Sequence, residues 1–523
     1  ALQRSTSIVM MARGAATLLL AGLAVLAAIG VSGNRAASHL EKPREEQPDG
    51  PRQWALLVAG SAGWGNYRHQ ADVCHAYQVL RRGGLKDENI VVMMADDIAH
   101  NPLNPHPGQI FNQPAGSNVY RGISKDYTGA EVNARNVLKV LAGDAEGMDG
   151  IGNGKVIASG PGDRVFFYFA DHGAPGILGM PSGPFLYAND LVDTLTNKSA
   201  AGGFSELVAY IEACESGSVF QGMDLKGLNI YATTAANARE SSWGTYCPGQ
   251  FPAPPPEFST CLGDLYSVAF LEDDDAADRR TESLQEQFER VKYRTSNNGT
   301  YMQGSHVLQW GDLSMTSEPV GRYIGFGSAA SKRREAEPAA RPLPHTPTEW
   351  RDWYRARRSE LLEVEEVAVA SGAAETHVPQ RDAELLALTT EYLRVTDPVK
   401  KAAAFEELND FVVERAAIDR TMGAVLEATL ESAPGLASTA AAFLASAPSS
   451  EEWARPGDDN KAAALMYTEM GRPGTEQLVD DWDCLKRGIA GYEAACGALG
   501  QYGMKYSRVV ANLCNLGFLE PFL

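Results

Sequence analysis

Five short apolar runs between residues 54 and 234 constrain the fold of this 523-residue chain more than any other feature. Each run is apolar almost throughout: WALLVAG at 54, IVVMM at 90, VFFYF at 165, LVAYIEA at 207 and NIYATT at 229. Continuous apolar strands are typical of a sheet that is buried on both faces. Helical patterns separate or follow the runs, around 70–83, 130–142 and 281–295. This alternation predicts an α/β fold with a mostly parallel sheet flanked by helices.

The first 33 residues have the pattern of a secretory signal peptide. Arg13 precedes a long apolar run, and small residues follow that run. Because Met10 and Met11 stand just before this arginine, residues 1–9 are expected to lie upstream of the true start. The alternative is an uncleaved signal anchor, since the apolar run is about long enough to cross a bilayer.

The rest of the chain divides into four segments by composition. Residues 34–51 are polar and contain proline, as expected of a propeptide or linker. Residues 52–327 hold the sheet pattern and are predicted to form one domain. Residues 328–348 are charged and rich in proline, so a linker is expected there. Residues 349–523 are rich in Ala, Glu, Leu and Arg with helical patterning, which predicts a second, all-α domain.

Net charge and cysteine content restrict the partners and the compartment. A formal net charge of -20 argues against a nucleic-acid partner, because phosphate binding needs clustered Lys and Arg. Most of the seven cysteines of a secreted chain should pair. Their spacing suggests a local disulfide, Cys247–Cys261, while Cys74 and Cys214 lie in helix and strand patterns. At least one more disulfide is expected among the three C-terminal cysteines, Cys484, Cys496 and Cys514.

Two of the predicted strands run directly into reactive residues. VFFYF leads into ADHG, which contains His172, and LVAYIE leads into ACESGS, which contains Cys214. In a parallel sheet both residues reach the same edge. A nearby imidazolium stabilises a thiolate and can then protonate a leaving amine. The N–H groups of Gly173 and Cys214 are candidate oxyanion donors. We interpret the pair as the centre of a cysteine peptidase; the alternative is a buried, inert thiol in a secreted binding module.

Longer motifs around this pair resemble one family. GSAGWGNYRHQADVCHAY at 60, FFYFADHG at 166, IEACESGS at 211, YATTAANARESSWGTYC at 231 and LGDLYS at 262 are similar to legumain, the asparaginyl endopeptidase also called vacuolar processing enzyme. The resemblance covers residues 52–326 and resumes at QRDAELL, DDWDCLK and QYGMKY in the C-terminal domain. The proline-rich segment from 246 resembles plant and green-algal members, whose loop is closed by a disulfide. A caspase-like sheet domain and a helical prodomain that caps the active site are therefore implied.

The resemblance also assigns residue roles. It implies that Cys214 is the nucleophile, that His172 is the general acid/base and that Asn66 orients the histidine. Asp171 can cyclise to a succinimide in some relatives. A neutral amide both donates and accepts hydrogen bonds, so a pocket for Asn needs carboxylates and cationic donors. The implied pocket residues are Arg68, His69, Glu212, Ser241, Ser242 and Asp264. Cleavage after Asn, and after Asp at lower pH, is the expected activity.

Activation in acid is expected, but the cleavage site stays open. Residues 331–348 contain neither Asn nor Asp, so the first candidates are Asp352, Asp382 and the pair at 409 and 410. The KRR run at 332 could instead admit a trypsin-like enzyme. Our hypothesis for release is that prodomain carboxylates face the cationic rim of the pocket and lose their charge as the pH falls.

Peptide ligation from the same acyl-enzyme is the alternative activity. In the family that this chain resembles, bulky residues near a gatekeeper position favour ligation. Here that position holds Gly244 and the proline-rich loop is full length, so both features favour hydrolysis. Ala174 and Pro175, in contrast, form a pair seen in some ligases of the family. A GPI-transamidase subunit is disfavoured, because that subunit normally carries a C-terminal membrane span. The sequons at Asn298 and Asn197 are candidate glycosylation sites.

No cofactor or metal is expected. The expected partners are protein and peptide substrates, namely vacuolar or secreted proproteins, and the chain's own prodomain as inhibitor. No membrane anchor should remain after signal cleavage. The expected location is an acidic compartment such as a vacuole or lysosome, with the extracellular space as the alternative.

Overall fold

The computed structural model describes residues 51–327, 377–432, 435, 438 and 478–518. The predicted signal peptide, nearly all of the propeptide, the linker at 328–348 and Asp352 lie outside the described residues.

A six-stranded sheet forms the centre of the first domain, with the strand order β11-β8-β7-β3-β1-β2. Five strands are parallel and correspond to the five apolar runs, whereas β11 at one edge is antiparallel to β8. The strands are β1 (Gln53–Ala59), β2 (Ile90–Met93), β3 (Arg164–Ala170), β7 (Glu206–Glu212), β8 (Ile230–Thr234) and β11 (Leu308–Gly311). The predicted mostly parallel sheet is confirmed. The pattern missed β11, whose residues are only partly buried.

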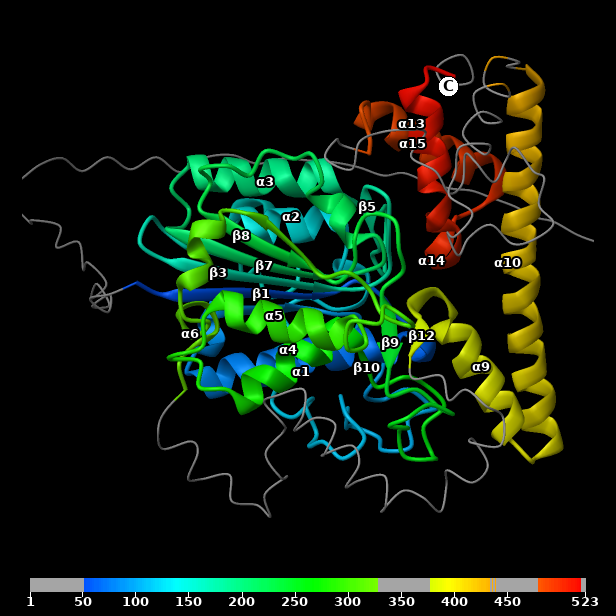
Figure 1. The fold of residues 1–523 in the computed structure, drawn as a ribbon. Coiled ribbons are helices and arrows are strands. Elements are labelled where there is room, and N and C mark those ends of the chain that lie inside the picture. The colour runs from blue at the N-terminus through cyan, green and yellow to red at the C-terminus, as the bar shows by residue number, and fades with distance from the viewer. Residues whose placement is uncertain (1–50, 328–376, 433–434, 436–437, 439–477, 519–523) are drawn as a thin grey trace, which may run out of the picture. The chain divides into compact units, whose positions relative to one another are not determined.

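Helices cover both faces of this sheet, as Figure 1 shows. One face carries α2 (Ala134–Ala142) and α3 (Ala188–Ala200), and the other carries α1 (Tyr67–Gly83), α4 (Leu265–Ala276) and α5 (Leu284–Thr295). Successive residues of β1 enter different cores: Ala55 and Leu57 pack on one side, Leu56 and Val58 on the other. Burial on both faces explains why the strands read as continuous apolar runs.

Short elements surround the carboxyl edge of the sheet. One small antiparallel sheet contains β4 (Gly173–Ala174), β5 (Ile177–Leu178) and β6 (Leu186–Tyr187). A second contains β9 (Trp243–Thr245), β10 (Gly263–Asp264) and β12 (Val378–Pro379). The helix α6 (Gly321–Ile324) closes the domain. Because β12 comes from the C-terminal region, that region enters the sheet domain as a strand.

The described part of the C-terminal region is otherwise helical. It contains α9 (Ala383–Arg394), α10 (Pro398–Ser432), α13 (Trp482–Cys496), α14 (Gly500–Gly503) and α15 (Ser507–Asn515). Met422 and Leu426 of α10 share a buried cluster with residues of α13 and α15. The helical prediction holds for these segments, while the two-residue strand β12 was not indicated by the pattern. No helix among the described residues is long and apolar enough to cross a membrane.

Candidate active site

The ends of the neighbouring strands β3 and β7 bring His172 and Cys214 to the same edge of the sheet. The two strands are in register, with Ala170 opposite Glu212, and the pairing continues one step further because Asp171 N–H donates to the Glu212 carbonyl at 3.0 Å. Both residues are buried. The edge predicted from the strand pattern is therefore where the structure places them.

Gly173 lies against the backbone of Cys214. A Cβ atom at this glycine would come within 2.3 Å of the Cys214 carbonyl oxygen, which is backbone and cannot move aside. The close approach therefore requires glycine at 173.

Asn66 fixes which nitrogen of His172 carries the proton. Asn66 Nδ2 donates to the Ala62 carbonyl at 2.9 Å and to Gln501 Oε1 at 2.8 Å, so Oδ1 is its acceptor atom. This Oδ1 lies 2.8 Å from His172 Nε2, whereas the Arg68 Nη2 donor lies further from that nitrogen, at 3.5 Å, so the shorter contact assigns the proton to Nε2. His172 Nδ1 has no hydrogen-bond partner among the described residues. Its lone pair is thus free to accept a proton.

The buried thiol and imidazole are both held neutral in this state. Burial raises the pKa of Cys214, and Glu215 adds to the rise, although Arg381 and hydrogen bonds from Ser241 and Ser242 oppose it. Burial also lowers the pKa of His172, and the cations of Arg68, Arg381 and Arg415 lower it further. A neutral thiol is a poor nucleophile.

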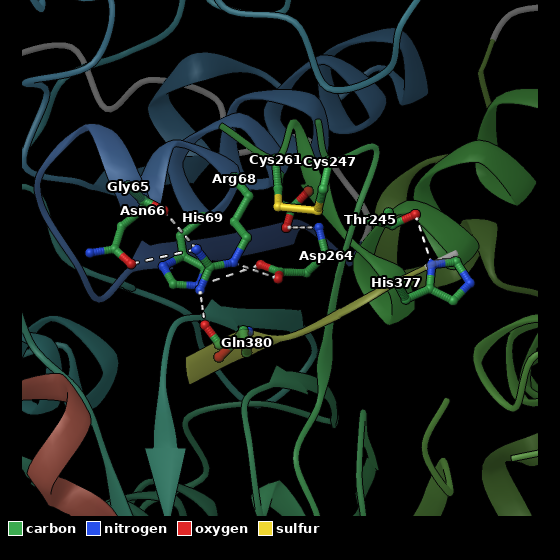
Figure 2. Close-up of a disulfide and its surroundings, with 11 residues drawn as sticks. Gly65, Asn66, Arg68, His69, Thr245, Cys247, Cys261, Asp264, His377 and Gln380 are labelled. Atoms are coloured by element: carbon green, nitrogen blue, oxygen red, sulfur yellow. Dashed lines mark hydrogen bonds and ion pairs between the residues drawn. A yellow bond between two sulfur atoms is a disulfide. The ribbon is translucent and has the colours of Figure 1, made fainter. Parts of the chain in front are cut away.

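Arg68 and Asp264 form a buried ion pair beside the reactive residues, visible in Figure 2. Arg68 Nε donates to Asp264 Oδ1 at 2.9 Å, and both side chains are fully buried. His69 Nε2 approaches the other Asp264 oxygen at 3.4 Å. The pair presents donors and an acceptor to the same space, as a carboxamide requires.

Glu212 is tied to the start of α4. Its Oε2 accepts from the backbone N–H and from the hydroxyl of Ser267, each at 3.1 Å. Burial raises the pKa of Glu212, and the charge of Asp264 raises it further.

Asp171 and His69 form a second buried pair. His69 Nδ1 lies 3.3 Å from Asp171 Oδ1 and 2.5 Å from the Ser61 hydroxyl, a contact that the sequence did not indicate. Burial raises the pKa of Asp171 to about 8, so this carboxyl group is neutral in acid. His69, Asp171 and His172 form a cluster, in which the nitrogen and oxygen atoms that could bind a metal ion lie within 4.8 Å of one another. The adjacent Arg68 guanidinium disfavours a metal cation there.

Gln380 of the C-terminal region occupies the space between these groups. The strand β12 pairs antiparallel with β9, and Gln380 follows it directly. Gln380 N–H donates to the Ser242 carbonyl at 3.0 Å, and its carbonyl accepts from Arg68 Nη2 at 3.3 Å (Figure 2). Its side-chain Oε1 lies 3.8 Å from Cys214 Sγ. The Gln380 side chain also acts on Asp264, since it is one of the groups that lower the pKa of that carboxyl against the rise caused by burial.

The serines assigned to the pocket flank the thiol. Ser241 Oγ lies 3.2 Å and Ser242 Oγ 4.0 Å from Cys214 Sγ. Of the assigned pocket residues, Arg68, Ser242 and Asp264 interact with Gln380. The role of Gln380 was missed, although its motif QRDAELL contributed to the family resemblance; nothing in a polar helical segment indicates which remote pocket it enters.

Arg381, the residue after Gln380, binds the C-terminal region to the sheet domain through hydrogen bonds and an ion pair. It donates to both carboxylate oxygens of Glu215, at 2.6 and 3.3 Å, and to the Gly173 carbonyl at 2.7 Å. A second link joins Lys486 of α13 to Asp190 of α3 at 2.6 Å. In both links the C-terminal region supplies the cation, the reverse of the polarity in our acid-release hypothesis. Glu384 is a carboxyl group of that region that interacts with the charge of Arg68. Burial raises the pKa of Glu384, and the Arg68 charge opposes this rise only in part.

The cysteines divide into two disulfides and three free thiols. The structure contains Cys247–Cys261, the disulfide suggested by the spacing, beside Arg68 and Asp264 (Figure 2). It also contains Cys484–Cys514, which joins α13 to α15 and leaves Cys496 free and exposed. Cys74 is buried in α1, and burial raises its pKa well above the ordinary value.

The remaining predicted positions lie around the site and on the surface. A Cβ at Gly244 would make ordinary contacts with Arg68 and the disulfide sulfurs, at 3.4 to 3.7 Å. Ala174 is buried, and the Pro175 carbonyl accepts from the Ser507 hydroxyl at 3.0 Å. Asn197 and Asn298 are both exposed, the first within α3 and the second in a turn after α5.

A thiol beside an imidazole of fixed tautomer, at the carboxyl edge of a parallel sheet, is the arrangement of a cysteine peptidase. Sequence comparison narrows the class of cysteine peptidases to one family. Residues 53–326 match the Peptidase C13 family, and residues 457–521 match the legumain prodomain. The chain belongs to the peptidase C13 family.

Curated relatives extend this match over most of the chain. The vacuolar-processing enzyme of Phaseolus vulgaris is 44% identical and the alignment covers 94% of this chain and 88% of that protein. The legumain of Canavalia ensiformis is also 44% identical, over 89% of this chain and 85% of that protein. A solved caspase-1 from Spodoptera frugiperda is 12% identical with a TM-score of 0.31, covering 53% of this chain and 92% of that chain, which is too low to bear on function. The family makes the chain a cysteine-type asparaginyl endopeptidase carried with its prodomain as a zymogen.

Proposed function

We propose that Cys214, His172 and Asn66 together hydrolyse the peptide bond that follows an Asn residue. Cys214 loses its proton to His172 Nδ1, the free nitrogen, and its sulfur attacks the substrate carbonyl. His172 then protonates the leaving amine, and water releases the acyl group. The N–H groups of Gly173 and Cys214 receive the oxyanion, and Asn66 holds the imidazole in the required tautomer.

The observation that carries this proposal is the carboxamide of Gln380 between Asp264 and Cys214. An Asn side chain ends in the same amide group one methylene earlier. We assign the Asn pocket to Arg68, which donates to the amide oxygen, and to Asp264, which accepts from the amide nitrogen. His69, Glu212, Ser241 and Ser242 complete its walls. A charged Asp side chain would meet Asp264, so its cleavage requires a proton on one of the two carboxylates and is expected at lower pH.

Gln380 therefore acts as an uncut substrate mimic. Its carbonyl oxygen accepts from Arg68 and so points toward the pocket instead of toward the backbone donors of Gly173 and Cys214. Attack at this carbonyl would leave the oxyanion without those donors. This orientation explains how the prodomain can occupy the site without being cleaved at 380.

Release of the prodomain requires the loss of two ion pairs that join it to the peptidase domain. In each pair the prodomain supplies the cation and the peptidase domain supplies the carboxylate: Arg381 pairs with Glu215, and Lys486 pairs with Asp190. Asp382, a candidate cleavage site, is half exposed and pairs with Arg415, whereas residues 409 and 410 are exposed within α10. Cleavage at 409 or 410 requires local unwinding of that helix.

We propose hydrolysis as the main activity and ligation as a side activity. Gly244 places no bulky side chain at the gatekeeper position, which favours hydrolysis of the acyl-enzyme. Ser507 of the prodomain holds the Pro175 carbonyl only in the capped state. Product masses from an Asn peptide, measured with and without an added amine nucleophile, separate the two. By analogy with the vacuolar-processing enzymes, we place the chain in the secretory pathway, in an acidic vacuole, with proproteins as substrates.

The test of this proposal is acid incubation of the zymogen followed by an assay on matched peptides with Asn, Gln or Asp before the scissile bond. The Asn peptide should be cleaved fastest at pH 5–6, and Cys214→Ser should abolish cleavage. Cleavage of the Gln peptide at a rate equal to that of the Asn peptide would sink the pocket assignment.

A further inference from the structure

A chain of buried polar groups runs from the pocket along the contact between α1 and α4. The pocket residue Asp264 receives its support from Asp72, which lies one helical turn after Arg68 on the same face of α1. Asp72 Oδ2 accepts from the Asp264 backbone N–H at 3.2 Å. The side chains of Asp72 and Asp264 each shift the pKa of the other, and Asp264 Oδ2 is buried without a hydrogen-bond partner among the described residues. Asp72 is fully buried and is used by no step described above.

The other carboxyl oxygen of Asp72 also accepts a hydrogen bond from a buried side chain. Asn112 Nδ2 donates to Asp72 Oδ1 at 2.6 Å, and Asn112 Oδ1 lies 2.8 Å from His75 Nδ1. His75 Nε2 in turn lies 3.0 Å from Asp275, which pairs with Arg82 near the surface. A Cβ at Gly263 would come within 2.9 Å of Asn112 and 3.1 Å of Asp72, so glycine there allows the bond between them.

The charge balance around Asp72 requires it to keep a proton. The charged and titratable groups that face Asp72 or contact its partners are Arg68, His69, Cys74 and His75 of α1, Tyr168 of β3, Glu212 of β7 and Asp264 of β10. Together with Asp72 this set contains three buried carboxyl groups and one permanent cation, Arg68. Burial, and then the charge of Asp264, raise the pKa of Asp72 well above its ordinary value. A protonated Asp72 has an O–H that can donate to Asp264, and Asp72 acts with Arg68 against the rise in the pKa of Asp264 that burial causes.

We propose that Asp72 is a positioning residue of the Asn pocket, which donates a hydrogen bond to Asp264 and so sets how strongly the pocket prefers Asn over Asp. The proposal rests on the proposed function. With the donor present, Asp264 keeps its negative charge into mild acid, accepts from the Asn amide and repels a charged Asp side chain. Without the donor, Asp264 takes up a proton at higher pH. Because a neutral Asp264 does not repel a charged Asp side chain of the substrate, cleavage after Asp then extends to higher pH.

The experiment compares Asp72→Ala, which removes the donor, with Asp72→Asn, which keeps one but cannot ionise. Each full-length zymogen is activated in acid, and kcat/KM is measured from pH 4 to 7.5 on peptides that differ only in Asn or Asp at the cleaved position. The matched control is Asp274→Asn, because Asp274 is a buried carboxyl group of α4 that accepts from Gln287 Nε2 at 2.8 Å.

Asp72→Ala should shift the pH limit of Asp cleavage upward by about one unit, which is about a tenfold higher Asp/Asn ratio at pH 6. Asp72→Asn and Asp274→Asn should keep the wild-type ratio within about twofold at every pH, as expected if the donor alone matters.

If Asp72 had a purely structural role, Asp72→Ala would lower kcat/KM for the Asn and Asp peptides by the same factor and leave the Asp/Asn ratio unchanged. That result would overturn the inference. If Asp72→Ala does not fold, a changed ratio in Asp72→Asn overturns it instead. Failure of the wild-type enzyme to cleave the Asn peptide would refute the proposed function itself, a different outcome from an unchanged ratio.

Discussion

Arg381 should be the residue whose loss most readily exposes Cys214 in the zymogen. Replacing it by Met keeps most of the side-chain length but removes three hydrogen bonds, two to Glu215 and one to the Gly173 carbonyl. The side chains of Arg381 and Glu215 are only 15% and 10% exposed, so water screens the pair weakly.

The magnitude follows from the buried carboxylate that the substitution leaves behind. Breaking a buried, hydrogen-bonded ion pair by removing one partner costs about 3–5 kcal/mol. We take the lower end, about 3 kcal/mol, because Glu215 gains some water once the arginine is gone. Each 1.4 kcal/mol is a factor of ten, so the equilibrium for opening should rise by roughly 10²-fold.

The assay is the rate of Cys214 alkylation by iodoacetamide in the intact zymogen at pH 7, read by mass spectrometry. Arg381→Met should be alkylated about 10²-fold faster than wild type. The matched control is Arg420→Met on α10, because Arg420 is an exposed arginine of the same prodomain. An exposed charge contributes at most about 1 kcal/mol, so this control should stay within about fivefold of wild type. A rate in Arg381→Met that is less than threefold above wild type would refute the reasoning.

Three further predictions test other parts of the site. Asn66→Ala frees the imidazole to take the wrong tautomer, so kcat of the activated enzyme should fall by roughly 10²-fold with little change in KM; a change confined to KM would contradict this role. Gly173→Ala forces a Cβ against the Cys214 carbonyl, so activity should be lost while the thermal unfolding temperature of the zymogen falls by several degrees. Burial acts to raise the pKa of Asp419, but hydrogen bonds from Tyr506 and Tyr502 and the charge of Lys505 lower it overall. A lowered folded pKa gives stability that is present above about pH 4 and lost as the pH falls below it, so Asp419→Asn should lower the free energy of unfolding of the prodomain at pH 6 and leave it unchanged near pH 2.

The sheet was predictable because burial on both faces leaves a distinct pattern. The five parallel strands, and with them the edge that brings His172 to Cys214, follow from runs such as VFFYF and LVAYIE. The edge strand β11 could not be found in this way, because its side chains are half exposed and its pairing with β8 depends on distant residues.

The pocket was predictable only in part. Arg68, His69 and Asp264 were assigned from the family resemblance, and the structure brings them together. Neither Gln380 nor Asp72 could be singled out from the residues alone. Gln380 reaches Cys214 across 166 positions of sequence, and Asp72 is an ordinary polar residue of a helix until its neighbours are known. The polarity of the prodomain links was also beyond the sequence, because it depends on which charges meet across the interface.

The central claim is that Cys214 cleaves after Asn once the prodomain has left the site. It is tested most directly by acid activation of wild-type and Cys214→Ser zymogens, followed by digestion of a mixed peptide library at pH 5.5 and terminal sequencing of every product. The wild type should produce new ends after Asn, joined by ends after Asp when the digestion is repeated at pH 4, and the variant should produce none. New ends after other residues, or ends after Asn that persist in Cys214→Ser, would contradict the account.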